Sequence, residues 1–180
     1  MEVLENMGGV LSSEQLRPLI EGEERPLITD WQNLDEQIQP NGFDMTLRSI
    51  SAYRGPGQIG VSTRDRILPE LETLSFDADG WVTLAPGIYQ IVYNEIVDIP
   101  VTLMALGRPR SSLPRGGATI HTAVWDAGYS GRSTSMLAVM NPEGFRLQQN
   151  ARVMQLVFFG MAKAPAVGYR GAYQNENVAP

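Results

Sequence analysis

Residues 107–131, GRPRSSLPRGGATIHTAVWDAGYSG, bring together side chains suited to phosphate chemistry. The first part of this stretch combines guanidinium groups and hydroxyls, in Arg108, Arg110, Ser111, Ser112 and Arg115. Such groups bond phosphate oxygens, so this part is expected to hold a phosphorylated ligand. The last part is a turn that carries one carboxylate, Asp126, and one aromatic ring, Tyr129. A carboxylate fixed on a turn can activate a water molecule, and the whole stretch therefore predicts a nucleotide phosphohydrolase.

The composition of the chain is that of a globular protein and excludes several kinds of site. A length of 180 residues suffices for one domain with a stable core. The net charge of −6 argues against nonspecific nucleic-acid binding, which needs a broad basic surface. The chain has no cysteine and one histidine, His121, which excludes disulfides, zinc–thiolate sites and multi-histidine metal sites. We find no signal peptide and no run of roughly 20 apolar residues, and therefore expect a cytoplasmic protein without a membrane partner.

The elements that would position these side chains are mostly short strands. A capping-box pattern, Ser12 with Gln15, predicts one helix over residues 13–21. Residues 23–41 are predicted to be irregular apart from a short strand at 27–29, and residues 54–80 to form a long excursion with turns. Apolar–polar alternation and β-branched residues predict strands at 43–47, 81–84, 88–97, 101–106, 120–125, 134–140, 145–147 and 152–159. This pattern favours an all-β sandwich or barrel in a single domain over residues 1–180, with residues 1–9 and 175–180 flexible.

The order and spacing of several motifs make the chain resemble the dUTPase/dCTP deaminase superfamily. In chain order the motifs are IQPNGFDMTL, LAPGIYQIVYNEIVDIP, GRPRSSLPRGG, DAGYSG, MNP, ARVMQLVF and YRGAYQ. The leading GVLSSEQLRPLI resembles the N-terminal helix of the dCTP deaminase branch and of the archaeal dUTPases close to it. The resemblance implies a distorted β jelly roll with one or two short helices. It also implies a homotrimer whose active sites are shared between subunits, and Mg²⁺ that bridges the nucleotide triphosphate.

The two activities of this superfamily differ in the atom that water attacks. In the dUTPases the aspartate of the D-x-x-Y-x-G turn, here Asp126, orients water towards the α-phosphorus, which gives dUMP and pyrophosphate. In the deaminases a glutamate ten residues later shuttles protons at the base, and here that position is Met136. Methionine cannot carry a proton, and no other carboxylate lies between Asp126 and Glu143. The sequence therefore favours a dUTP diphosphatase.

The resemblance implies phosphate-side roles for a further set of residues. The loop is expected to bind the phosphates of a nucleotide that lies in the site of a neighbouring subunit. The loop residues with this role are Arg110, Ser111, Ser112 and Arg115. Gln155 is expected near the α-phosphate and the attacking water, as a second catalytic residue beside Asp126. Mg²⁺ would be held by the substrate's phosphates without direct protein ligands. Asp44 would lie near the metal-bound waters or would bond the Arg/Ser loop.

Other residues are implied to contact the nucleoside. The hairpin residues Ala123 and Val124 are expected beside the base. Tyr129 is expected to lie under the deoxyribose and to leave no space for a 2′-hydroxyl, which excludes UTP. In the tail, Tyr169 and Arg170 are expected to contact substrate. The deaminase pattern has a lysine where Ala172 stands, and Arg170 is expected to supply the phosphate contact of that lysine.

Several alternatives remain open from the sequence. Asp126 could cap its own hairpin, Gln155 could face solvent, and Tyr129 could be a core residue. A dCTP deaminase, alone or combined with dUTP hydrolysis, is the alternative within the superfamily. A catalytically idle relative that binds nucleotide or a partner is the alternative outside enzymes. Main-chain groups of the hairpin read much of the base in this superfamily, so base selectivity also stays open.

Overall fold

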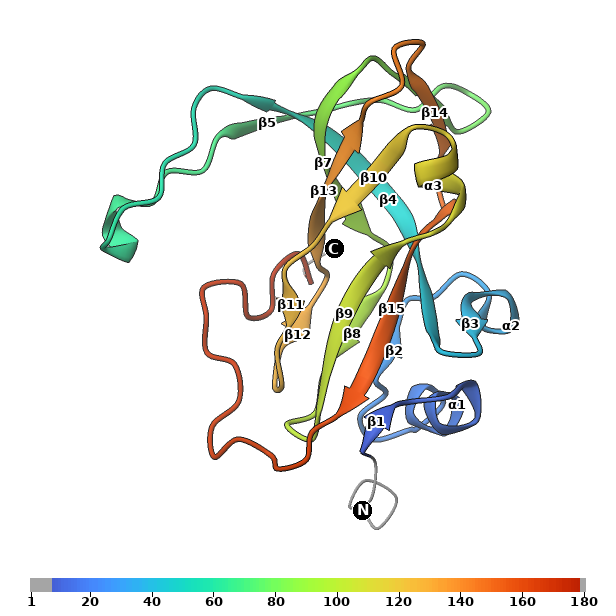
Figure 1. Ribbon diagram of the computed structural model, residues 1–180, viewed down its shortest axis with the longest axis vertical. Coiled ribbons are helices and arrows are strands. Elements are labelled where there is room, and N and C mark those ends of the chain that lie inside the picture. Colours follow the sequence, from blue (N-terminus) through green and yellow to red (C-terminus); the bar gives the residue numbers. More distant parts are fainter. Residues whose placement is uncertain (1–7, 179–180) are drawn as a thin grey trace.

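The computed structural model describes residues 8–178, so the expectations for residues 1–7 and 179–180 lie outside the described residues. The described chain is mainly β, as expected, with a few short helices (Figure 1). The strands are β1 Gly9–Val10, β2 Ile28–Thr29, β3 Ile38–Gln39, β4 Gly42–Arg54, β5 Glu70–Thr73, β6 Trp81–Leu84, β7 Gly87–Tyr93, β8 Ile96–Asp98, β9 Leu103–Pro109, β10 Ala118–His121, β11 Val124–Trp125, β12 Ser130–Gly131, β13 Thr134–Val139, β14 Phe145–Gln148 and β15 Arg152–Gly160.

These strands form one large curled sheet and two small ones. The large sheet has ten strands and follows the order β10-β13-β7-β4-β15-β9-β11, with β1, β3 and β5 attached beside this path. The small sheets are β12-β8-β2 and β14-β6. The curling of the sheet confirms the predicted all-β jelly-roll class. Neighbours in the sheets come from distant parts of the chain, and the C-terminal tail likewise meets β12, where Gly131 bridges to Glu176.

Strand β4 connects the two halves of the large sheet. Its first half pairs with β15 and its second half with β7 and β5, and the register shifts in both long pairings. The sequence predicted a half-buried strand here, with Asp44 and Thr46 on the open face. In the structure both are 1–2% exposed, because neighbouring elements cover both faces of this part of β4. Asp44 is thereby held in the interior, close to the Arg/Ser loop.

The strand predicted over residues 88–97 is in fact two strands, β7 and β8, separated by Asn94 and Glu95. Glu95 is fully buried and accepts hydrogen bonds from Thr46 N–H at 2.9 Å, Thr46 Oγ1 at 2.6 Å and Gln37 Nε2 at 2.7 Å. Burial raises the pKa of the Glu95 carboxyl. These bonds tie the break to β4 and explain why the chain changes sheets here. Similarly, the predicted strand 120–125 divides into β10 and β11.

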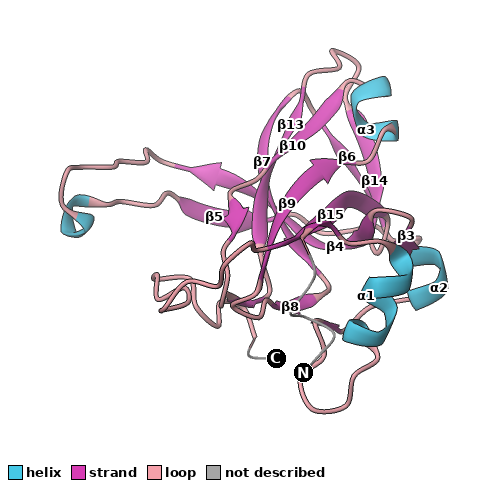
Figure 2. Cartoon of the chain, turned by 60° about the horizontal axis from the view of Figure 1, so that its bottom comes forward, coloured by secondary structure: helices cyan, strands magenta, loops and turns pink. Residues whose placement is uncertain are grey.

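The helices are short and more numerous than the one or two expected (Figure 2). Helix α1, Ser13–Ile20, begins at the predicted capping box, where Ser12 N–H donates to Gln15 Oε1 at 3.0 Å. The others are α2 Leu34–Gln37, α3 Ser112–Arg115 and a 3₁₀ turn, η2 Thr63–Asp65. Single turns of this length carry no helical period, so sequence patterning could not predict them. No helix in residues 8–178 is long and apolar enough to cross a membrane.

Candidate active site

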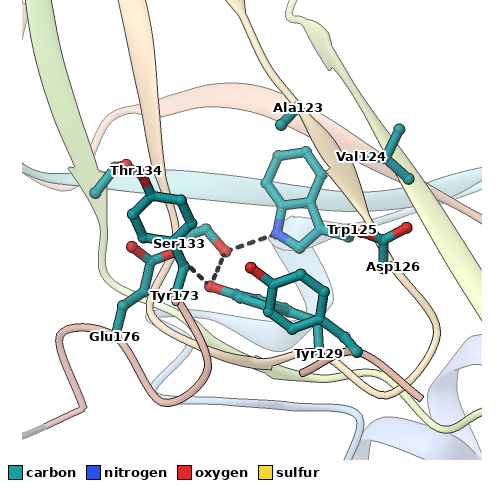
Figure 3. A pocket seen from close by; sticks show the side chains of 10 residues that line it. Ala123, Val124, Trp125, Asp126, Tyr129, Ser133, Thr134, Tyr173 and Glu176 are labelled. Atoms are coloured by element: carbon teal, nitrogen blue, oxygen red, sulfur yellow. Dashed lines mark hydrogen bonds between the residues drawn. The ribbon is translucent and has the colours of Figure 1, made fainter. Parts of the chain in front are cut away.

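A cavity of about 270 Å³ lies between residues 124–131 and the C-terminal tail (Figure 3). Residues 124–131 comprise β11, a turn and β12 and are called the hairpin below, although β11 pairs with β9 and β12 with β8. Its lining residues are Ala123, Val124, Trp125, Asp126, Tyr129, Ser133, Thr134, Tyr169, Tyr173 and Glu176. Sites that enclose a drug-sized ligand measure about 300–1,000 Å³, so this cavity suits a ring and its sugar better than a whole nucleoside triphosphate. The lining includes two carboxylates, and within the described chain it includes no lysine or arginine.

The turn of the hairpin brings Asp126 and Tyr129 to the same cavity. Tyr129 N–H donates to the Asp126 carbonyl oxygen at 3.0 Å and closes the turn. Gly128 has a φ of 89°, which favours glycine, and a Cβ there would lie 2.8 Å from the Cα of Gly168. The glycine therefore permits both the turn and the close passage of the tail.

Tyr129 forms the floor of the cavity. The residue is 6% exposed, and its hydroxyl lies 3.0 Å from Ser133 Oγ and donates to Glu176 Oε1 at 2.9 Å (Figure 3). Ser133 Oγ in turn accepts a hydrogen bond from Trp125 Nε1 at 2.6 Å. Burial raises the pKa of the Tyr129 hydroxyl above its usual range. Tyr129 therefore remains a neutral ring at a fixed position, in contact with both the cavity and the core.

Asp126 lies at the edge of the cavity, where Figure 3 shows its side chain beside Val124. The residue is exposed, and in the described part of the chain its carboxylate has no hydrogen-bond donor. The alternative in which Asp126 caps its own hairpin through its side chain is therefore not what the structure contains. A solvated carboxylate without a structural partner is available to bind water.

The C-terminal tail packs against the hairpin. Asn175 N–H donates to the Ser130 carbonyl at 2.8 Å, and Arg132 N–H donates to the Glu176 carbonyl at 2.9 Å. Tyr169 lies edge-on to Tyr129, with 5.7 Å between the ring centroids. Arg170 is exposed and is not part of the cavity lining. The tail thus supplies one wall of the site.

The Arg/Ser loop lies apart from this cavity. Ser112 and Arg115 begin and end helix α3, and Arg110 and Ser111 directly precede it. Figure 1 shows α3 at the upper right, away from β11 and β12, and none of the four residues lines the cavity. The first half of the loop leads out of β9, and Arg115 Nη1 donates to the Ser111 carbonyl at 3.2 Å. The chain therefore divides the predicted site residues into two groups.

Asp44 and Gln155 belong to the loop group. Arg110 Nη1 lies 2.7 Å and Arg152 Nη1 3.7 Å from Asp44 Oδ2. Gln155 pairs across the sheet with Asp44 on one side and Arg108 on the other, so the three side chains leave the same face. Burial raises the pKa of the Asp44 carboxyl, and the two guanidinium groups oppose this. Gln155 is therefore held beside the cationic loop and not beside Asp126.

Comparisons with known proteins identify the family. The model of the dCTP deaminase-like family matches residues 10–161. The chain belongs to the dCTP deaminase-like family. It is 49% identical over 168 residues to a probable deoxyuridine 5′-triphosphate nucleotidohydrolase of Methanosarcina mazei, which covers 93% of this chain and 98% of that protein. A protein of the same name from Archaeoglobus fulgidus is 47% identical over 169 residues. This match covers 94% of this chain and 98% of that protein.

A solved structure supports the fold of this dCTP deaminase-like protein. The 2′-deoxycytidine 5′-triphosphate deaminase from Agrobacterium tumefaciens superposes with a TM-score of 0.67 at 20% identity. The match covers 87% of this chain and 49% of that chain, so this protein spans about half the length of that deaminase chain. At this identity the likeness shows a shared fold.

Sequence reasoning about this dCTP deaminase-like protein missed part of the cavity. Trp125, Ser133 and Thr134 adjoin the predicted turn in the sequence. Their closeness to the turn could have predicted that they line the same site. Glu176 and Tyr173 reach the cavity through the folding of the tail, for which no local signal exists. Glu176 thereby adds a second carboxylate to the cavity lining, beside Asp126.

The raised pKa of the Glu176 carboxyl leads us to expect that the stability of the protein depends on pH. Burial raises its pKa above the ordinary value of 4.5, against the lowering effect of the Tyr129 hydrogen bond. The folded protein therefore holds this proton more tightly than the unfolded chain. The resulting stability is present below pH 4.5 and is lost as pH rises through the raised pKa.

Thermal denaturation of the wild type and of Glu176→Gln measures this effect. The Tm of the variant, relative to the wild type, should rise as pH increases from below 4.5 and should level off above the raised pKa. Glu143→Gln, which removes an exposed carboxylate from a turn, is the control. A Tm difference that is independent of pH would contradict the assignment.

Proposed function

We propose that this protein is a dUTP diphosphatase that hydrolyses dUTP to dUMP and pyrophosphate, with water activated by Asp126. The oxygen of water bonds to the α-phosphorus, and the bond from that phosphorus to the α–β bridging oxygen breaks. Pyrophosphate leaves, and Asp126 takes the proton of water. The observation that carries the proposal is an exposed carboxylate, without a hydrogen-bond donor among residues 8–178, at the edge of a nucleoside-sized cavity. The names of the archaeal relatives at 47–49% identity support the substrate.

Tyr129 would select the sugar. Its ring forms the floor of the cavity and is fixed by Ser133 and Glu176. A deoxyribose stacked on this ring would have its 2′-carbon towards an immobile surface, which leaves no volume for a hydroxyl. Ala123 and Val124 would contact the base from the hairpin, and Tyr169 would close the other side. UTP would therefore bind poorly.

The triphosphate would be bound by a second copy of the chain. The cavity has two carboxylates and, among the described residues, no cation in its lining, so it cannot by itself neutralise a triphosphate. The Arg/Ser loop carries suitable donors, in Arg110, Ser111, Ser112 and Arg115, but it lies elsewhere on the same chain. A homotrimer in which the loop of one subunit reaches the cavity of the next would complete the site, with Gln155 near the α-phosphate.

The described residues contain no cluster of three or more acidic or histidine side chains that could hold a metal ion. Mg²⁺ keeps several waters and leans on substrate phosphates, so the residues present fit a metal that arrives with the nucleotide. When bound, it would supply charge neutralisation to the triphosphate. Asp44 is paired with two arginines, and it could accept a bond from metal-bound water once Arg110 turns to the phosphates.

Deamination of dCTP is the second candidate, and Glu176 is the observation that favours it. Met136 leaves the family's glutamate position without a proton carrier. Glu176, however, is a half-buried carboxylate in the cavity lining with a raised pKa, as a proton shuttle requires. Its bond to Tyr129 engages one of its oxygens. Release of ammonia from dCTP that is lost in Glu176→Gln would establish this second activity.

The test is a product assay with purified protein, Mg²⁺ and one of dUTP, dCTP or UTP. Pyrophosphate and dUMP from dUTP, with little reaction of UTP, are the expected result. Equal cleavage of UTP would remove the role of Tyr129. If no nucleotide reacts while dUTP still binds, the protein is an idle relative and the proposal is wrong.

A further inference from the structure

An arm formed by residues 55–69 projects from the body between β4 and β5 (Figure 1). The arm has a defined path, because Gln58 and Ile67 exchange two backbone hydrogen bonds of 2.9 Å. At its tip Ser62 Oγ accepts from Arg64 N–H at 3.2 Å and begins the 3₁₀ turn η2. Arg66 follows this turn directly, so its backbone position is fixed by both features.

Arg66 reaches from the arm to the tail. Its guanidinium carbon lies 5.4 Å from the centroid of the Tyr173 ring, a cation–π contact. The arm and the tail lie on the same side of the molecule in both Figure 1 and Figure 2. Tyr173 lines the cavity beside the hairpin. Arg66 is thus a cation one residue removed from the proposed nucleotide site.

The part of the tail that Arg66 contacts is otherwise weakly attached. On the N-terminal side of this part, Tyr169 N–H donates to the Ala127 carbonyl at 2.8 Å. On its C-terminal side, Gln174 and Asn175 are both hydrogen-bonded to Ser130. Between these anchors, the described chain outside the tail forms no hydrogen bond to residues 170–173. Within the tail the Tyr173 carbonyl accepts a hydrogen bond from Glu176 N–H at 3.2 Å, and from outside the tail Arg66 contacts the Tyr173 ring over the cavity.

We propose that Arg66 is a positioning residue that clamps the tail over the bound nucleotide through Tyr173. The proposal rests on the function proposed above, since it assumes a nucleotide in this cavity. The cavity lining is acidic and would repel an anionic ligand. The positive charge of Arg66 would partly offset this repulsion. The clamp depends on one contact between the arm and the tail, that of Arg66 with Tyr173.

Steady-state kinetics with dUTP test the clamp. Arg66→Gln should raise KM about two- to fivefold and leave kcat nearly unchanged, and Arg66→Lys should restore most of the loss, because a cation above the ring remains. Tyr173→Leu should raise KM as well, and adding Arg66→Gln to it should have no further effect. Arg64→Gln, in the same arm, is the matched control and should keep the wild-type KM.

Limited trypsin digestion without nucleotide gives a readout that does not depend on activity. Cleavage after Arg170, followed through the released peptide that begins at Gly171, should be faster in Arg66→Gln than in Arg64→Gln. If cleavage speeds up but the wild type does not hydrolyse dUTP, the proposed function fails and the tail clamp stands. If dUTP is hydrolysed and Arg66→Gln changes neither cleavage nor KM, the clamp is wrong. Faster cleavage with an unchanged KM would overturn its role in nucleotide binding.

Discussion

Asp126→Asn is expected to hydrolyse dUTP about 10²- to 10⁴-fold more slowly than the wild type, with the loss in kcat. Asparagine keeps the shape of the side chain but cannot accept the proton of water at neutral pH. The fold should be unaffected, because the Asp126 carboxylate is exposed and has no donor among residues 8–178. Pyrophosphate release under saturating dUTP measures kcat, and thermal denaturation checks the fold.

Glu143→Gln provides the control for this experiment. It removes another exposed carboxylate from a turn, outside the cavity, and should keep wild-type activity. Glu176→Gln provides the comparison within the cavity and should retain most of the dUTP hydrolysis if Asp126 alone handles the proton. A wild-type rate in Asp126→Asn would remove Asp126 as the base.

Mixing two impaired variants, Arg110→Gln and Asp126→Asn, is expected to restore activity if the sites are shared between subunits. Arg110→Gln should lower dUTP hydrolysis about ten- to hundredfold, since a charged hydrogen bond to phosphate is lost. In a three-subunit ring that contains both Arg110→Gln and Asp126→Asn chains, one site always combines an intact loop with an intact hairpin. Double-tagged trimers should therefore recover about one third of the wild-type activity.

The outcome separates the arrangements sharply. If each site were built within one chain, every site of a mixed trimer would lack one group and activity would stay at the level of the single variants. Failure to recover any double-tagged assembly would contradict the trimer. Because Arg110 pairs with the buried Asp44, Arg110→Gln leaves a buried carboxylate with one fewer partner. Arg115→Glu, at an exposed position of the same loop, repeats the test without disturbing that pair.

The sequence predicted those parts of the fold whose cause is local. The capping box located the start of α1, and alternation located most of the strands. Predictions were wrong where distant groups decided the outcome. The break between β7 and β8 depends on the buried Glu95, whose partner Thr46 lies 49 residues away, and a run of β-branched residues could not indicate it.

For the candidate site, the sequence by itself determined the family motifs, the turn that presents Asp126 and Tyr129, and the absence of a glutamate at position 136. These depend on residue identity and short spacing. Tertiary structure alone decided that the Arg/Ser loop lies apart from the cavity, that Asp44 pairs with Arg110, and that Glu176 bonds Tyr129 across 47 residues of chain. Such contacts follow from how the sheet curls and where the tail packs. Local propensities carry no information about either.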